Sequence, residues 1–455
     1  MAGIGFSLRR LLRSDSYLGQ LQAYGYAGII GAGPWTLSIL GVMLIGVLSL
    51  GVVLPTGKII QFLVSITYLM AASLTLTGLL QIMFTRFVAD RLFEKKPQVI
   101  LPNLLGALTL TTLISAVGGL LVLGLFPQES LLYRLLMLVN LVVLCNIWIV
   151  AIFLSSIKSY HAILGAFFVG YSVTVVAALL LRPLGLEGLL TGFLLGQALL
   201  LFVMLALVVR DHPGERLVSF AFLDWRQSFY SLALTGLLFN LGVWADKFIF
   251  WMNPVTSESV IGPLRASVVY DLPIFLAYLS IIPGMAIFLV RMETDFAEHY
   301  EEFYDAVRGG ETLAHIEGFK DKMVTTIRQG IYEIFKVQGL TVVILFLAGP
   351  AILEIIGLSP LYIHLFKIDL VAVGVQVLLL SILNVLFYLD KRMVALSLCL
   401  LFAVSNIVFT LVSQYLGPAF YGYGFAFAVT LSSLVGLALL ARKLERLEYE
   451  TFMLQ

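Results

Sequence analysis

The feature that most constrains this chain is the recurrence of long apolar runs with few or no charged residues. The first run, from Tyr24 to Leu54, contains no Asp, Glu, Lys or Arg. A stretch of roughly 20 apolar residues is long enough to cross a hydrocarbon core of about 30 Å as a helix. Further runs lie near residues 60–89, 102–126, 131–157, 160–181, 186–209, 229–252, 265–290, 331–356, 366–388, 393–416 and 418–440. The sequence therefore predicts an all-α polytopic membrane protein with about twelve transmembrane helices.

The composition agrees with this class and excludes several others. Hydrophobic residues make up 60% of the chain and charged residues 12%, about half the charged fraction of a soluble protein. The net charge of +1 gives no reason to expect nucleic acid as a partner. Cys145 and Cys399 lie deep in apolar runs, which argues against a disulfide framework or a thiolate metal site. The sequence contains no phosphate-binding loop, dinucleotide fingerprint or zinc motif. We therefore expect that the protein is not an enzyme and has no catalytic residues, metal or cofactor.

The distribution of basic residues predicts the orientation in the membrane. With the N-terminus inside, most Lys and Arg residues fall on the cytoplasmic side, as the positive-inside rule requires. The basic segments concerned include "LRRLLR" at 8–13, "RLFEKK" at 91–96, "DKR" at 390–392 and "ARKLERL" at 441–447. We therefore expect both termini to be cytoplasmic.

A polar break at residues 210–228 divides the runs into six and six. We predict an N-terminal six-helix bundle over 1–209, a cytoplasmic linker over 210–228 and a C-terminal six-helix bundle over 229–455. Two patterns recur in both halves. Gly33 and Trp35 in the first run have the same spacing as Gly242 and Trp244 in the seventh, and Arg-x-x-x-Asp ends the second and eighth runs. The Arg-x-x-x-Asp residues, Arg86 with Asp90 and Arg291 with Asp295, have the spacing of helix-end salt bridges. Chance similarity remains the alternative to an internal repeat.

The first run carries residues that weaken a helix at its predicted cytoplasmic end. Gly28, Gly31 and Gly33 are followed directly by Pro34; glycine lowers helix stability and proline removes a backbone donor. We expect a bend that opens or narrows a transport path, with Tyr24 and Trp35 beside it. The glycines should also permit close backbone packing against neighbouring helices. The alternative is a static kink.

Polar residues inside the seventh and eighth runs are the candidates for a substrate path. Charges at membrane depth are costly, so they generally face a cavity or a partner. In the seventh run these are Asn240, Trp244, Asp246 and Lys247, and in the eighth Tyr270 and Asp271, with Pro273 as a second bend. The alternative reading is that Asp246 and Lys247 form a pair that only locks helix packing.

Residues 291–330 form the only long polar stretch, a cytoplasmic amphipathic segment. Four aromatic residues share one helical stripe, Phe296, Tyr300, Phe303 and Tyr304, and Gly309–Gly310 should end that helix. An amphipathic helix needs something to cover its apolar face. We expect either a docking site for a partner protein or packing against the chain's own helix ends.

Several long segments resemble the PelG family, the inner-membrane transporters of Pel exopolysaccharide systems. They are "MAGIGFSLRRLLRSDSYLGQLQAYGYAGIIGAGPW", "ADKFIFW", "IGPLRASVVYDLPIFLAYLSIIPGM" and "RMETDFAEHYEEFYDAVRGG". The family belongs to the polysaccharide-transporter branch of the multidrug/oligosaccharidyl-lipid/polysaccharide exporter superfamily, called the MOP superfamily. The resemblance implies two six-helix bundles around a central cavity in the bacterial cytoplasmic (inner) membrane.

The resemblance also implies a function and partners. The substrate would be an N-acetylhexosamine-rich exopolysaccharide, exported across the lipid bilayer for the biofilm matrix. The partners would be a cytosolic glycosyltransferase (PelF-like), a cyclic-di-GMP receptor (PelD-like) and a membrane scaffold (PelE-like). The competing reading is an ion-coupled alternating-access exporter of lipid-linked oligosaccharides or drugs, with Asp246 as the coupling carboxylate. A neighbouring Lys247 favours a charged carboxylate, which argues against a proton-carrying role.

Overall fold

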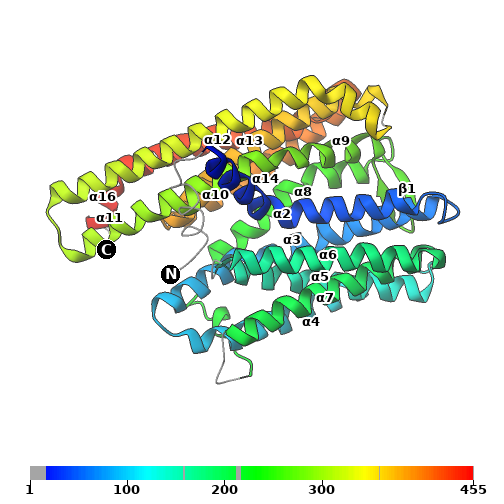
Figure 1. Cartoon of the computed structure of the whole chain (residues 1–455), viewed down its shortest axis with the longest axis horizontal. Coiled ribbons are helices and arrows are strands. Elements are labelled where there is room, and N and C mark those ends of the chain that lie inside the picture. The colour runs from blue at the N-terminus through cyan, green and yellow to red at the C-terminus, as the bar shows by residue number, and fades with distance from the viewer. Residues whose placement is uncertain (1–16, 157–158, 212–216, 358, 454–455) are drawn as a thin grey trace. The chain divides into compact units, whose positions relative to one another are not determined.

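A computed structural model describes residues 17–156, 159–211, 217–357 and 359–453 (Figure 1). The basic segment at 8–13 and the last residues of the chain lie outside this described part. The first seven long helices are α2 (Tyr17–Ser49), α3 (Gly57–Phe93), α4 (Ile100–Leu123), α5 (Leu131–Ser156), α6 (Tyr160–Leu181), α7 (Leu186–Asp211) and α8 (Tyr230–Met252). The later helices are α9 (Val268–Tyr278), α10 (Ile282–Val290), α11 (Ala297–Gly309), α12 (Leu313–Ile356), α13 (Ile363–Tyr388), α14 (Arg392–Leu416), α15 (Tyr423–Glu445) and α16 (Leu447–Met453).

The remaining elements are short. Strands β1 (Glu258–Ile261) and β2 (Leu264–Ala266) form an antiparallel hairpin, and a π-helix, η5 (Arg291–Phe296), joins α10 to α11. The 3₁₀ turns are η1 (Pro97–Val99), η2 (Arg182–Leu184), η3 (Ala221–Leu223), η4 (Leu279–Ile281), η6 (Pro360–Tyr362) and η7 (Pro418–Phe420).

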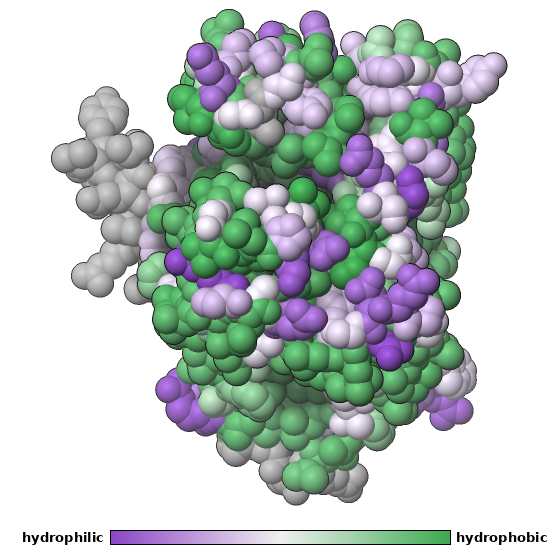
Figure 2. Space-filling model, turned by 90° about the vertical axis from the view of Figure 1, so that its right-hand side faces the viewer, coloured by the Kyte–Doolittle hydropathy of each residue, from purple (hydrophilic) through white to green (hydrophobic). Residues whose placement is uncertain are grey.

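The number of spans confirms the prediction from the apolar runs. Among the described residues, 11 helices are long and apolar enough to cross a membrane, and the bent helix α2 brings the number to 12. The bend in α2 is 64° between its segments Tyr24–Pro34 and Thr36–Ser49, where the proline interrupts the helical hydrogen bonds. Large apolar side chains in the middle of spans face outward: Leu113 is 62%, Val176 57% and Leu347 78% exposed. Such outward-facing apolar side chains are expected for helices that contact lipid. Figure 2 shows the side on which β1 lies in Figure 1, where hydrophobic residues are interspersed with patches of hydrophilic ones.

The chain forms two compact units. The first unit combines the residues up to Gly33 with those from Val269 onward, and the second runs from Pro34 to Val268. These units differ from the six-plus-six division at 210–228. The first part of α2 packs with the later helices, and α8 packs with the earlier ones, against α3. The predicted division concerns internal repetition of the sequence and stays a prediction.

In the unit from Pro34 to Val268, small residues let helices meet backbone to backbone. A Cβ atom at Gly236 of α8 would lie 2.2 Å from the carbonyl oxygen of Gly78 in α3, and one at Gly78 would lie 2.8 Å from that of Gly236. No real side chain fits there, so both positions require glycine. Helices α4, α5 and α7 pack against α3 in the same unit, and α6 packs on α7 (cyan to green in Figure 1).

In the other unit, α10 and α12 to α15 pack as a bundle, and α11 forms a hairpin with the first part of α12. At about 1.5 Å per residue, the 44 residues of α12 extend roughly 66 Å, about twice the thickness of a hydrocarbon core. The predicted segment 291–330 thus contains η5, α11 and the start of α12, and its cytoplasmic location stays a prediction. Helix α12 continues without interruption into the ninth span, and Gly310 ends α11 with a positive φ of 67°.

Candidate functional site

The eighth span is interrupted, as the prolines in its sequence predict. Helix α9 contains Pro273, and the 3₁₀ turn η4 separates it from α10. Such a break leaves backbone groups without helical partners. The buried side chain of Gln338, from α12, forms hydrogen bonds with two of these backbone groups. Its Nε2 donates to the carbonyl oxygen of Ser280 at 3.1 Å, and its Oε1 accepts from the backbone N–H of Gly284 at 3.1 Å. The sequence analysis missed Gln338, whose only signal is a lone amide in an apolar run.

The start of the eighth span differs from the prediction. The helix begins at Val268 and not near 265, because Gly262, with a positive φ of 50°, allows the chain to turn between β1 and β2. Arg265 therefore lies in β2, where its guanidinium donates to the side chain and backbone of Ser257 at 2.8 and 2.6 Å. Tyr270 is buried and Asp271 half-buried in the first turn of α9.

The charged pair predicted in the seventh span is present and buried. Lys247 Nζ lies 3.1 Å from Asp246 Oδ2 and donates to the carbonyl oxygen of Val243 at 2.9 Å. The Lys247 and Asp246 side chains are 1% and 0% exposed. Asn240, one turn earlier, donates to the carbonyl oxygen of Gly236 at 3.0 Å. In this conformation the pair fits the packing alternative; a place on a cavity wall stays a prediction for a conformation that uncovers it.

Aromatic rings surround this pair. The Lys247 ammonium lies 5.9 Å from the ring centroid of Trp244, and Trp244 lies 6.2 Å from Trp251. Trp251 in turn stacks on Tyr68 of α3 at 4.4 Å between ring centroids. The cluster connects α8 to α3, and the Tyr68 hydroxyl donates to the backbone carbonyl of Arg265 in β2 at 2.9 Å. The β-hairpin and the charged pair are thus parts of one packed region.

The glycines before Pro34 allow α2 to approach α10 closely. A Cβ atom at Gly28 would lie 3.4 Å from that of Ala286, and one at Gly31 would lie 3.2 Å from the carbonyl oxygen of Met285. Gly33 is buried, and the side chain of Trp35 lies outside the described part of the structure. The expected close packing is therefore seen, and the role of the bend in gating stays a prediction.

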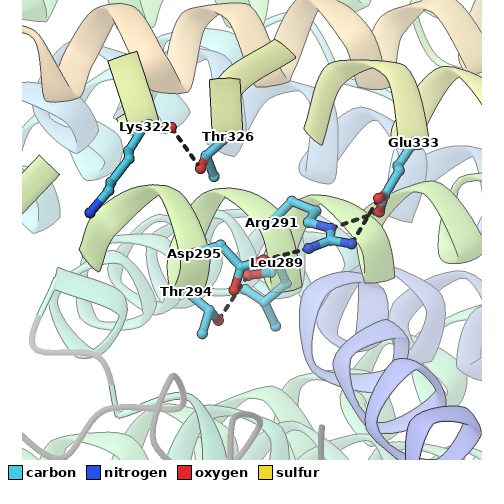
Figure 3. A network of polar contacts seen from close by, with 7 residues as sticks. All are labelled: Leu289, Arg291, Thr294, Asp295, Lys322, Thr326 and Glu333. Atoms are coloured by element: carbon cyan, nitrogen blue, oxygen red, sulfur yellow. Dashed lines mark hydrogen bonds and ion pairs between the residues drawn. The ribbon is translucent and has the colours of Figure 1, made fainter. Parts of the chain in front are cut away.

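The helix-end pairs of the Arg-x-x-x-Asp pattern both form. Arg86 Nε lies 3.0 Å from Asp90 Oδ1, and Arg291 Nη1 lies 2.6 Å from Asp295 Oδ2. Arg291 also donates from Nε and Nη2 to the two carboxylate oxygens of Glu333, at 2.6 and 2.7 Å (Figure 3). This bidentate contact fixes η5 against α12.

The residues around Arg291 border a hollow of about 200 Å³ between η5 with the start of α11 on one side and α12 on the other. It is lined by Arg291, Asp295, Glu298, His299, Thr326 and Gln329. Tyr24, from the start of α2, lies within electrostatic reach of Arg291, Glu333 and Asp295. The structure thus brings together residues that the sequence analysis assigned separately to a substrate path and to helix ends.

The aromatic stripe of α11 is covered by the chain itself. Phe296 and Phe303 are buried, and the ring of Tyr388, at the end of α13, lies 5.2 Å from Phe296 and 5.6 Å from Tyr300. Tyr304 packs on Phe303 at 5.0 Å. This arrangement corresponds to the second alternative, packing against the chain's own helix ends. A partner docking at these residues stays a prediction.

The C-terminal helix α16 completes this cover. Glu450 is paired with Lys391 and Lys443 at 2.5 and 2.6 Å, and Glu448 with Lys320 of α12 at 2.9 Å. Burial raises the pKa of Glu450, but the two lysines lower it more, so its pKa lies below the usual value. The carboxylate is therefore charged at neutral pH. Its two lysine pairs hold α16 against the start of α14 and the end of α15, and the Lys320–Glu448 pair holds it on α12.

The predicted path residues fall in both units. Asn240, Trp244, Asp246 and Lys247 lie in the unit from Pro34 to Val268, and Tyr24, Tyr270 and Asp271 in the other. Over the described part of the chain, no three His, Cys, Asp or Glu side chains lie together as metal ligands would. The polar groups described above form hydrogen bonds and ion pairs.

Comparison with known families decides the class of protein. Residues 1–452 match the PelG family, described as "Putative exopolysaccharide Exporter (EPS-E)". The chain belongs to the PelG family. No curated protein matches the sequence. As a PelG-family protein with 11 or 12 candidate membrane spans among its described residues, the chain is a multi-pass transporter of the inner membrane.

Solved structures show that this PelG-family chain has the fold of the MOP superfamily. An outward-facing multidrug resistance MATE family transporter of that superfamily is 15% identical in sequence. The alignment covers 97% of this chain and 98% of that transporter, with a TM-score of 0.67. A MOP superfamily transporter from Pyrococcus furiosus is 14% identical, with coverages of 96% and 98% and a TM-score of 0.68. An inward-facing MATE transporter is 13% identical, with coverages of 93% and 96% and a TM-score of 0.59. At these identities the likeness establishes the fold alone.

Proposed function

We propose that this protein moves an N-acetylhexosamine-rich exopolysaccharide, the Pel polymer, across the inner membrane for the biofilm matrix. The observation that carries the proposal is the match to an exopolysaccharide exporter family over residues 1–452. The match extends over both units and the hairpin formed by α11 and the start of α12. A transporter fold with twelve apolar spans supplies the membrane passage that such a substrate requires.

We further propose that a cytosolic glycosyltransferase delivers the growing chain to the transporter, with a cyclic-di-GMP receptor and a membrane scaffold in the same complex. A tethered enzyme raises the effective concentration of the chain end to about millimolar. The hairpin of α11 and α12 is the largest part of the chain beyond the spans and is the proposed contact. Because Phe303 is buried, a partner would contact the outward-facing side of α11 or displace α16.

The hairpin and both termini are proposed to be cytoplasmic. The support is the position of the basic segments, of which 91–96 and 390–392 connect spans on the same side as the hairpin under the positive-inside rule. The loop 55–57, between α2 and α3, then faces the periplasm. A topology reporter inserted in this loop should report a periplasmic location.

The proposed path combines the polar residues of α8 and α9 with the bend of α2 at Pro34. The bend of α2 at Pro34 is 64°, and the glycines before it pack closely against α10. The path residues Asp246 and Lys247 would take part in a conformation in which they are uncovered.

The second candidate is an ion-coupled alternating-access exporter of lipid-linked oligosaccharides or drugs. The similarity to MATE transporters described as outward-facing and inward-facing favours it. Against it, Asp246, the carboxylate that would couple transport to an ion, is engaged by Lys247 at 3.1 Å and is fully buried. We therefore favour the first proposal, export of the polysaccharide.

A cell-based experiment tests the proposed function. Cells that lack this protein but retain the glycosyltransferase should accumulate no extracellular N-acetylhexosamine polymer, measured with a lectin. Complementation with the full chain should restore it. Undiminished extracellular polymer in the deletion strain would contradict the proposal. Export of a drug but not of polymer on complementation would favour the second candidate.

A further inference from the structure

The hollow at the base of the hairpin has the structure of a small binding site. It opens where α10 passes into η5, and α12 forms its other wall. Its volume of about 200 Å³ is below the range of about 300–1,000 Å³ typical of drug-sized ligands. A single sugar ring fits this space better than a nucleotide or a lipid headgroup with its chains. One wall is a π-helix, a rare element that occurs frequently at functional sites.

The polar groups of the hollow are held in place before any ligand arrives. Arg291 is clamped between Asp295 and Glu333 by three hydrogen bonds of 2.6 to 2.7 Å (Figure 3). His299 Nδ1 lies 3.0 Å from Glu302 Oε2, which orients the ring. Preorganised groups reduce the entropy lost on binding.

The remaining hydrogen-bonding capacity suits hydroxyl and amide groups. Each carboxylate oxygen has two acceptor sites, so Asp295 keeps acceptor capacity beyond the bond from Arg291. Gln329 contributes both a donor and an acceptor, and Thr326 a hydroxyl that bonds only the Lys322 carbonyl of its own helix, at 3.0 Å. A pyranose ring offers alternating donors and acceptors to such a set, and an N-acetyl group adds an amide N–H for a carboxylate.

The charge of the hollow argues against an anionic ligand. Asp295 and Glu298 line the hollow beside one guanidinium, Arg291, which is already paired with Asp295 and Glu333. A phosphate would meet carboxylates here and would lack a free cation to bind. A neutral ligand avoids this repulsion.

We propose that the hollow lined by Asp295, Glu298, Thr326 and Gln329 binds one N-acetylhexosamine ring of the exported glycan. The inference rests on the proposed function for the nature of the glycan, and it assigns a subsite to that function. The sugar ring would be held at the base of the hairpin, where the glycan would first reach the eighth span. The competing interpretation is a hydrated gap beside a structural ion-pair network.

The test is a pair of matched substitutions on one helix. Thr326→Phe fills the hollow, whereas Thr325→Phe places the same ring on an exposed position of α12 that does not line it. The full-length protein in nanodiscs is titrated with N-acetylgalactosamine and N-acetylglucosamine trisaccharides, and binding is followed by saturation-transfer NMR. We expect the wild type and Thr325→Phe to bind one of them, and Thr326→Phe to bind it at least about tenfold more weakly.

A second pair covers the case in which Thr326→Phe fails to fold. Glu298→Gln alters a lining carboxylate, and Glu301→Gln alters an exposed one on the same helix; only the first should weaken binding. Absence of trisaccharide binding by wild type, or equal binding by both members of the pairs, would overturn the inference. If polymer export by wild-type cells is intact in that case, the proposed function stands and only the subsite is wrong. If the proposed function itself were wrong, deletion of the gene would leave polymer export unchanged.

Discussion

Gln338 should be one of the strongest single contributors to the stability of its unit. Its amide is 2% exposed and satisfies the carbonyl of Ser280 and the N–H of Gly284, on the two sides of the break in the eighth span. Replacement by methionine keeps the length of the side chain but removes both hydrogen bonds. Each buried group left unsatisfied costs about 1–3 kcal/mol. Gln338→Met should therefore lower the free energy of unfolding by about 2–6 kcal/mol.

The effect is measurable by steric trapping in bicelles, which reports the free energy of unfolding of a membrane protein. Thr341→Val is the matched control on the same helix. The Thr341 hydroxyl donates to the Val337 carbonyl at 2.9 Å, so its loss orphans no buried backbone group. We expect this control to stay within about 0.5 kcal/mol of wild type. If Gln338→Met were equally neutral, the reasoning that its amide holds the broken span together would be refuted.

Three further predictions follow from the packing, the buried charges and the topology. Gly236→Ala should destabilise by about 1–3 kcal/mol through overpacking, measured by steric trapping, whereas Gly165→Ala, with nothing within 4 Å of its Cβ, should not. Asp246→Ala or Lys247→Ala should each cost about 3–5 kcal/mol by stranding a buried charge and should abolish export; recovery of export when the two residues are exchanged would show that the pair is only structural. A reporter inserted at 309–310 should be cytoplasmic, and a periplasmic signal there would reverse the proposed orientation.

Most of the spans could be predicted because each is recognised from the apolar residues of one continuous segment. The run near 131–157 is helix α5, Leu131–Ser156, and the run near 186–209 is α7, Leu186–Asp211. Local pairs could also be predicted: Arg291 and Asp295 are one helical turn apart, so their contact depends on the helix alone. Gly310 ends α11 for a similarly local reason.

The contacts that could not be predicted join segments far apart in the chain. Glu333 binds Arg291 from 42 residues away, and Lys320 meets Glu448 across 128. Neither of these long-range contacts produces a periodic pattern in the sequence. The cover on Phe296 and Tyr300 comes from Tyr388, far along the chain in α13, so two alternatives remained open for the aromatic stripe.

The most direct test of the account is transport of newly made polymer into vesicles. The protein is reconstituted together with the glycosyltransferase outside, nucleotide sugar is added, and polymer protected in the lumen is measured with and without ionophores that collapse ion gradients. We expect lumenal polymer that requires both proteins and persists when the gradients are collapsed. Polymer that remains outside the vesicles under all conditions would contradict the assignment of this protein as the exporter.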